Sequence, residues 1–104
     1  MDVRNNGAIA GIVPDSAVEV SSVITKEGPV PLSIGPLPIA VNGLVQQIKS
    51  FERLVVEAAV EGNRDKALLA LSVNPLTSSD HVAKEVIDEL MVRHKVYLPQ
   101  FYTE

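Results

Sequence analysis

The stretch PIAVNGLVQQIKSFERLVVEAAVEG, residues 38–62, decides the fold of this chain. Its apolar residues recur at intervals of three and one, which is the spacing of one helical stripe and not the alternation of a strand. They are Val41, Leu44, Val45, Ile48, Phe51, Leu54, Val55, Ala58 and Ala59. Pro38 suits the first helical turn, and Gly62 suits a left-handed cap. We therefore predict a helix over about 38–61 as the main core element, since burial of each large side chain contributes roughly 1.5–3 kcal/mol.

The composition is that of a small folded domain with an acidic charge balance. The 104 residues are 46% hydrophobic but only 4% aromatic, so the predicted core is aliphatic. A net charge of −4 without a basic cluster argues against nucleic acid as a partner. Without cysteine there is no disulfide, no thiolate metal site and no cysteine nucleophile. No signal pattern and no apolar run of transmembrane length is present, so we expect no membrane partner and a cytoplasmic protein.

The first residues are predicted to form a loop over 1–16. Asn5, Asn6 and Gly7 have the composition of a turn or of a backbone that approaches another group closely. Two interpretations stay open for the asparagines. An ordinary turn is favoured because Asn-Gly pairs are common turn formers. The alternative is that Asn5 or Asn6 points its amide group into a polar pocket.

A β-hairpin is predicted over 17–34. Residues 18–24 are mostly β-branched and apolar, and residues 30–34 alternate weakly between apolar and polar. The turn between them contains Gly28, at a position that tolerates positive φ. The prolines of the second strand cannot donate to a ladder, which favours an edge position for that strand.

The rest of the chain predicts two further helices, over about 64–73 and 79–97. Asn63 suits the N-cap of the first, and Asn74-Pro75 stops it because the residue before a proline is pushed out of helical geometry. The polar run 77–80 supplies caps for the second. The proline near the end of the chain stops that helix and leaves a tail. We expect one partial domain over 1–104.

A search for chemistry finds no complete site in these residues. His81 and His94 are thirteen residues apart, without metal-ligand spacing, and are predicted to be solvated or capping residues. Two pairs of carboxylates at i and i+4 lie opposite the apolar stripes and are predicted to be solvated faces rather than an acid–base pair. These pairs are Glu57 with Glu61 and Glu85 with Glu89. No phosphate-binding glycine loop and no nucleophile elbow is present.

Several distinct motifs follow one another along nearly the whole chain. They are Asn5-x-Gly7-Ala8-Ile9, Val18-Glu19-Val20, Gly35-Pro36-Leu37-Pro38, Glu52-Arg53-Leu54-x-x-Glu57-Ala58-Ala59-x-x-Gly62-x-Arg64-Asp65-x-Ala67-Leu68, Asn74-Pro75-Leu76 and Tyr97-Leu98-Pro99. This set resembles the C-terminal part of the family-four glycoside hydrolases, which depend on NAD and a divalent metal. Within that family, the Gly-Pro-Leu-Pro entry, Gln47-x-Lys49-x-x-Glu52-Arg53 and Ala67-Leu68-Leu69-Ala70-Leu71 look most like the 6-phospho-β-glucosidases.

The resemblance implies an α+β fold, a β-hairpin followed by three helices, like the C-terminal part of the lactate/malate dehydrogenase-like C-terminal domain. It also implies an oxidation, elimination and addition sequence on 6-phospho-glucosides, an exception to two-carboxylate glycoside hydrolysis. The NAD fingerprint, the Cys and His that hold Mn²⁺ and the Tyr base belong to parts of the family that precede this segment. The resemblance therefore implies no catalytic, cofactor-binding or metal-binding residue in this chain.

Two functions compete at this point. The chain is either the C-terminal scaffold of a hydrolase, partnered by an N-terminal Rossmann half, or a stand-alone, non-catalytic, self-associating module. In the first case Asn5 and Asn6 are the candidates to line the sugar-phosphate side of the site. In both cases we expect a homo-oligomer. A face of the hairpin carrying Val18, Val20 and Val23 has no evident cover, and exposed apolar patches of this kind are rare in soluble monomers.

Overall fold

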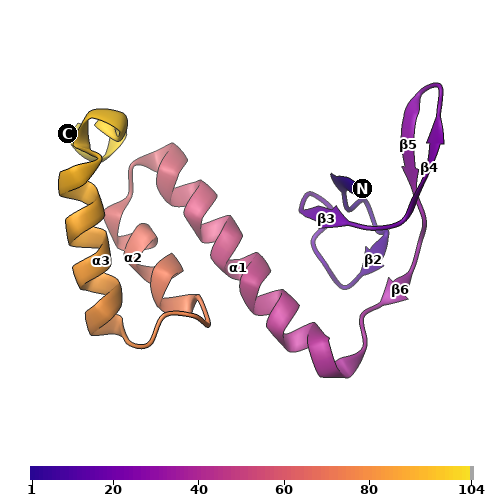
Figure 1. The fold of residues 1–104 in the computed structure, drawn as a ribbon, viewed down its shortest axis with the longest axis horizontal. Helices are drawn as coiled ribbons and strands as arrows, with labels where there is room; N and C mark the ends of the chain where they lie inside the picture. The colour runs from indigo at the N-terminus through magenta and orange to yellow at the C-terminus, as the bar shows by residue number, and fades with distance from the viewer. Residues whose placement is uncertain (104) are drawn as a thin grey trace. The chain divides into compact units, whose positions relative to one another are not determined.

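The computed structural model describes residues 1–103 and divides the chain into two compact units, Met1–Gly43 and the part that begins at Leu44. Figure 1 shows short strands in the first unit and helices in the second. The boundary falls within the first helix, α1 (Ile39–Glu61). This mixture of short strands and three α-helices confirms the predicted α+β class. Each unit is described by itself below.

The first unit contains strands in the region where the sequence predicts a loop. β1 (Asp2–Arg4) pairs antiparallel with β3 (Ala17–Glu19), with Val3 opposite Val18. β2 (Ile9–Ala10) pairs parallel with β6 (Gly35–Pro36). Strands of two or three residues are too short to show alternation, and their partners lie far along the chain, so local sequence did not predict them.

The predicted hairpin exists but is shorter than 17–34. β4 (Ser22–Thr25) and β5 (Gly28–Pro31) pair antiparallel, with Val23 opposite Val30. Gly28 has the predicted positive φ, +114°. Residues 17–19 pair with β1 instead of continuing the hairpin, because the strand is interrupted at positions 20–21.

The core of the first unit corrects the expectation for Val18 and Val20. Both are buried, so neither belongs to an uncovered face. They share the interior with Ala8, Ile9 and Ile12. The expectation fails because Val18 of β3 points inward and packs against the N-terminal segment, for which the sequence predicts a loop.

The second unit begins within α1, whose bounds agree with the prediction. The Pro38 carbonyl accepts from the backbone N–H groups of Val41 and Asn42, at 3.1 and 3.0 Å. Gly62 ends the helix with φ +67°, as predicted for a left-handed cap. The prediction that this helix is the main core element is wrong for the described residues. Of its predicted stripe only Ala58 is buried, and the large side chains are half-buried or exposed.

The remaining helices are α2 (Arg64–Val73) and α3 (Asp80–Arg93), followed by the 3₁₀ turns η1 (Lys95–Tyr97) and η2 (Pro99–Phe101). Asn63 caps α2 as predicted, since its Oδ1 accepts from the Lys66 N–H at 3.0 Å. Ser79 caps α3, accepting from Val82 at 3.2 Å. α3 ends at Arg93 and not at residue 97: η1 occupies the last residues of the predicted helix, and η2 lies in the predicted tail.

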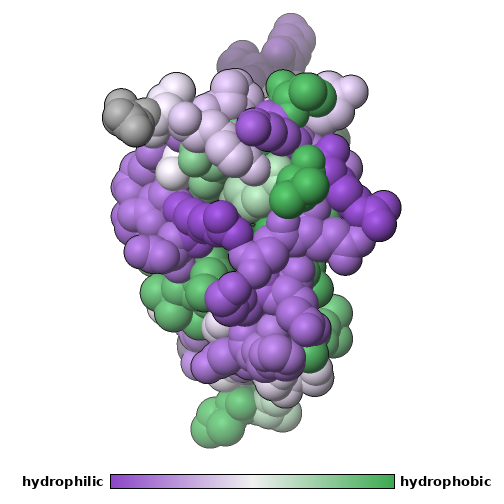
Figure 2. Space-filling view, turned by 90° about the vertical axis from the view of Figure 1, so that its left-hand side faces the viewer, coloured by the Kyte–Doolittle hydropathy of each residue, from purple (hydrophilic) through white to green (hydrophobic). Residues whose placement is uncertain are grey.

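The interior of the second unit consists of Ala58, Ala70, Ala83 and Met91. Three alanines bury little apolar surface, and larger residues remain outside. Val82, Val86 and Leu90, on successive turns of α3, are more than a third exposed. Figure 2 shows hydrophilic residues over most of the face on the α3 side, with apolar residues in separate patches. No helix among residues 1–103 is long and apolar enough to span a membrane.

Candidate functional site

The loop that holds both predicted site residues is built on a tight turn. Asn6 and Gly7 have φ of +43° and +88°, and the Ala8 N–H donates to the Asn5 carbonyl at 2.8 Å. Positive φ at both central positions is the pattern of a type I′ turn, for which Asn-Gly is the favoured pair. The turn interpretation of this segment is therefore confirmed.

Asn5 is fully buried and its side-chain amide holds the loop closed. Nδ2 donates to the carbonyls of Ile9 and Ile12, at 3.1 and 2.8 Å. Oδ1 accepts from the Ile9 N–H at 2.8 Å. Buried polar groups of this kind are costly unless they are paired, and these hydrogen bonds satisfy both ends of the amide. Asn5 therefore fixes the backbone conformation of the loop between Asn5 and Ile12.

Asn6 differs from its neighbour. Its side chain is exposed, and within residues 1–103 it makes no hydrogen bond, while its backbone N–H donates to the Pro14 carbonyl at 2.8 Å. The amide of Asn6 is therefore available to a ligand, whereas that of Asn5 is occupied. The structure of this chain leaves the substrate-lining role of both residues a prediction.

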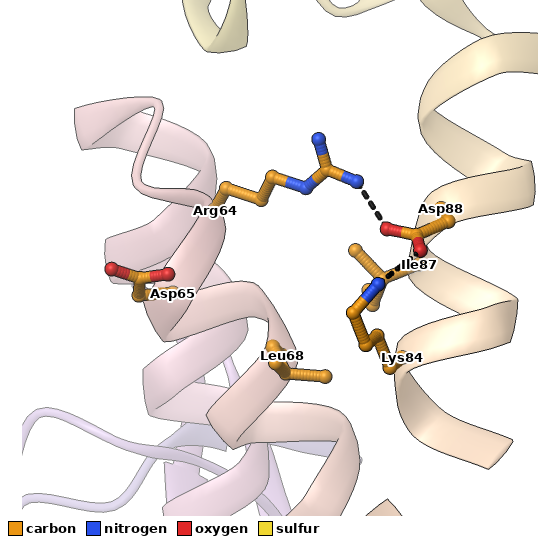
Figure 3. Close-up of a pocket in the computed structure, with 6 residues that line it drawn as sticks. All are labelled: Arg64, Asp65, Leu68, Lys84, Ile87 and Asp88. Atoms are coloured by element: carbon orange, nitrogen blue, oxygen red, sulfur yellow. Dashed lines mark hydrogen bonds and ion pairs between the residues drawn. The ribbon is translucent and has the colours of Figure 1, made fainter. Parts of the chain in front are cut away.

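A pocket of about 400 Å³ lies between α2 and α3. Figure 3 shows Arg64 of α2 and Lys84 of α3 converging on the carboxylate of Asp88, with Leu68 and Ile87 between the helices. Lys84 Nζ lies 2.7 Å from Asp88 Oδ2, and Arg64 pairs with the other oxygen. The hydrogen bond from Lys84, assisted by Arg64, lowers the pKa of Asp88 below its ordinary value of 3.8. This arrangement is an ion-pair cluster that ties two helices together.

The carboxylate pair at the end of α1 forms ion pairs with a lysine from α2. Lys66 Nζ lies 2.9 Å from Glu61 Oε1 and 3.3 Å from Glu57 Oε2. These contacts, with Glu61 first, raise the pKa of the Lys66 ammonium. Glu57 also lies 3.7 Å from Arg53 Nε, so both carboxylates are engaged in ion pairs and are not poised for acid–base catalysis. Sequence spacing gave no signal for Lys66, since its contacts cross from one helix to the next.

The histidines remain outside any site. His81 Nε2 lies 3.3 Å from Glu85 on the same exposed face of α3, and His94 caps the end of that helix. Within the part of the chain that the structure describes, no three His, Cys, Asp or Glu side chains are grouped to hold a metal ion. Two further ion pairs at i and i+4 lie along α3, Lys84 to Asp88 at 2.7 Å and Arg93 to Glu89 at 2.7 Å.

The fold and its motifs match a known domain. Residues 1–77, from β1 through the turn after α2, match the family 4 glycosyl hydrolase C-terminal domain. The chain belongs to family 4 of the glycosyl hydrolases. The match includes the Asn5 loop, the hairpin and Gly62, whereas the Tyr97-Leu98-Pro99 motif lies outside the matched residues.

Curated relatives agree with this membership. A probable 6-phospho-β-glucosidase of Bacillus subtilis is 60% identical over 100 residues, which is 96% of this chain and 23% of that protein. A maltose-6′-phosphate glucosidase of Fusobacterium mortiferum is 35% identical over 93% of this chain and 22% of its own length. The chain thus spans less than a quarter of the family 4 relatives that it matches.

Solved family 4 structures share the fold. A 6-phospho-α-glucosidase from gut microorganisms, in complex with NAD and glucose-6-phosphate, has a TM-score of 0.90 and 37% identity. The match covers 95% of this chain and 22% of that one. A second 6-phospho-α-glucosidase structure, with NAD and Mn²⁺, has a TM-score of 0.86 and 34% identity over 90% of this chain and 22% of its own.

Proposed function

We propose that this chain is the C-terminal segment of a 6-phospho-β-glucosidase and contributes scaffold and subunit contacts rather than a complete active site. The observation that carries the proposal is the 60% identity to the Bacillus subtilis protein over 96% of the chain. Identity to the maltose-6′-phosphate glucosidase of Fusobacterium mortiferum is 35%. An Escherichia coli 6-phospho-β-glucosidase is 33% identical, so the choice of the β-glucoside rests on the Bacillus subtilis protein.

The cofactors enter the proposal through the parent enzyme. Related structures hold NAD with glucose-6-phosphate in one case and NAD with Mn²⁺ in the other. No ligand set for a metal is present within residues 1–103, so the residues of this chain do not fit that role by themselves. We infer that an N-terminal Rossmann half of the enzyme holds both groups, and that the cytoplasm is where the assembled enzyme works.

Within the assembled enzyme, Asn6 is the better of the two candidates to touch the sugar phosphate. Its amide is exposed at the tip of a rigid turn, whereas the Asn5 amide is occupied by Ile9 and Ile12. Asn6→Gly keeps the positive φ of the turn and removes only the side chain. In the enzyme that contains this segment, we expect the variant to raise KM or lower kcat. Unchanged kinetics would leave Asn6 with its role in the turn alone.

An assay of the purified chain tests the scaffold proposal. We expect no hydrolysis of a 6-phospho-β-glucoside with NAD⁺ and Mn²⁺, and no binding of NAD by calorimetry. Measurable turnover in a contaminant-free preparation would overturn the proposal. A reading of the DNA upstream is the complementary observation: an in-frame Rossmann fingerprint and a metal-binding cysteine are expected there.

A second candidate is a self-associating, non-catalytic module. It is favoured by the β4–β5 hairpin, where Val23, Ile24 and Val30 are 53%, 66% and 51% exposed. A two-stranded hairpin is marginal in water without a third strand or a helix against it. Val23 and Val30 lie opposite each other on one face, and a second copy that covers them would form a homodimer with the same surface on both sides. Under either candidate we expect a homo-oligomer.

A further inference from the structure

The segment after α3 turns back onto the end of α1. The Gln100 side chain donates through Nε2 to the carbonyl of Ala59 at 3.1 Å, across 41 residues of sequence. Ala59 lies in the last turn of α1, where carbonyl groups lack an intrahelical partner. The N–H of Asn63, the donor four residues on, bonds to Ala58 instead, at 3.0 Å. Gln100 therefore supplies a cap that the helix does not supply for itself.

The backbone of the same segment lies directly against Gly62. A Cβ placed on Gly62 would lie 2.0 Å from the carbonyl oxygen of Gln100 and 2.6 Å from its carbonyl carbon. No side chain fits in that space. The glycine thus serves both the left-handed cap of α1 and the close approach of η2.

One contact holds the segment to α3, and a second joins the two ends of the segment to each other. The Tyr102 hydroxyl donates to the backbone carbonyl of Met91, one of the few buried residues of this unit. The ammonium of Lys95 lies 4.9 Å from the centroid of the Tyr102 ring, within cation–π range. Side-chain hydrogen bonds from Gln100 and Tyr102 therefore hold the second 3₁₀ turn to the helices, and Leu98 and Phe101 are only half-buried.

The shallow burial of the segment makes it a candidate for independent motion, since no residue of 95–102 is buried. Val96 and Tyr97 are exposed, and short 3₁₀ turns have poorer hydrogen-bond geometry than an α-helix. Segments with few buried apolar contacts open locally without global unfolding. We propose that residues 95–102 form a strap that opens and closes over the ends of α1 and α3 as a local unit, with the helices folded in both states.

Amide hydrogen exchange of the full chain tests the strap. Its reporters are the hydrogen-bonded N–H groups of Tyr97, Leu98, Phe101 and Tyr102. Gln100→Leu removes the bond to Ala59, and Tyr102→Phe removes the bond to Met91 but keeps the ring over Lys95. We expect either variant to speed exchange at these amides by up to about tenfold, with α2 unchanged.

Gln47→Leu is the matched control. Gln47 Nε2 donates to the Val73 carbonyl at 2.9 Å, so the substitution and the lost bond are of the same kind but lie at the end of α2. This variant should leave the strap amides unchanged. Two results would show that residues 95–102 do not open separately. One is a strap variant that speeds amide exchange equally in the strap and in α2, and the other is no faster exchange in either strap variant. If Gln100→Leu does not fold, Tyr102→Phe alone decides the outcome.

Discussion

Asn5 and Ile9 pair reciprocally: the Asn5 amide donates to the Ile9 carbonyl at 3.1 Å and accepts from the Ile9 N–H at 2.8 Å. The Asn5 side chain thereby bonds both backbone groups of Ile9 in β2, as a residue of a neighbouring strand would. Because Ile9 also pairs with Gly35 in β6, this contact links the N-terminal turn to the segment that leads into α1.

Removal of the Asn5 amide is predicted to destabilise the first unit. Asn5→Ala leaves the Ile9 N–H and the Ile12 carbonyl without the Asn5 partner, at about 1–3 kcal/mol for each unsatisfied group, while the Ile9 carbonyl keeps the Ile12 N–H. Denaturant unfolding followed by circular dichroism measures the loss. Asn6→Gly is the control, and its stability should be close to that of the wild type. Equal stability of Asn5→Ala and the wild type would contradict the assigned role.

Gly43 inside α1 and Gly62 just after its end offer a matched pair of glycines. Gly62→Ala forces a side chain into positive φ and against the Gln100 backbone, so we expect a loss of about 2 kcal/mol or more. Gly43 lies inside α1 with open space around its Cβ position, and Gly43→Ala should stabilise by about 0.5–1 kcal/mol. Thermal denaturation distinguishes the two. The two changes in stability must have opposite signs, and a Gly62→Ala variant as stable as the wild type would refute the close approach of Gln100 to Gly62.

The ion-pair cluster predicts a pH dependence on the acid side. The pKa of Asp88 is lowered in the folded chain by Lys84 and Arg64, so its stabilising contribution is present above the ordinary value of 3.8. That contribution is lost as the pH falls below 3.8 through the folded pKa. Asp88→Asn should therefore flatten the fall of stability with pH in this range. Urea unfolding between pH 2 and 5 measures it, and identical slopes in both proteins would count against the cluster.

Self-association is predicted to depend on the hairpin. Val23→Lys places a charge on an exposed apolar surface of β4, and sedimentation velocity should show a shift from dimer to monomer with unchanged circular dichroism. Val92→Lys, at an exposed position of α3, is the control and should remain associated. A wild-type chain that sediments as a stable, folded monomer would show that the hairpin is not a dimer contact.

Features set by neighbouring residues could be predicted from the sequence. The spacing of the apolar stripe fixed the bounds of α1, and the caps at Asn63 and Ser79 depend on hydrogen bonds within three residues. The turn at Asn6-Gly7 follows from backbone preference alone.

Features that depend on contacts between distant residues could not be predicted from the sequence. The strap joins Gln100 to Ala59, a contact that no local pattern encodes. The burial of Val18 depends on β1, whose three residues show no alternation. Burial of the α1 stripe was overestimated because a periodic stripe identifies the face of a helix that packs, and not the element that packs against it.

The activity of a chimera tests the central claim most directly. In the Bacillus subtilis probable 6-phospho-β-glucosidase, this chain would replace the homologous C-terminal residues, with the enzyme lacking that segment as control. We predict a chimera that hydrolyses a 6-phospho-β-glucoside with NAD⁺ and Mn²⁺, with kcat/KM within about tenfold of the parent, and an inactive truncated control. A chimera that folds and assembles like the parent but shows no turnover would contradict the account.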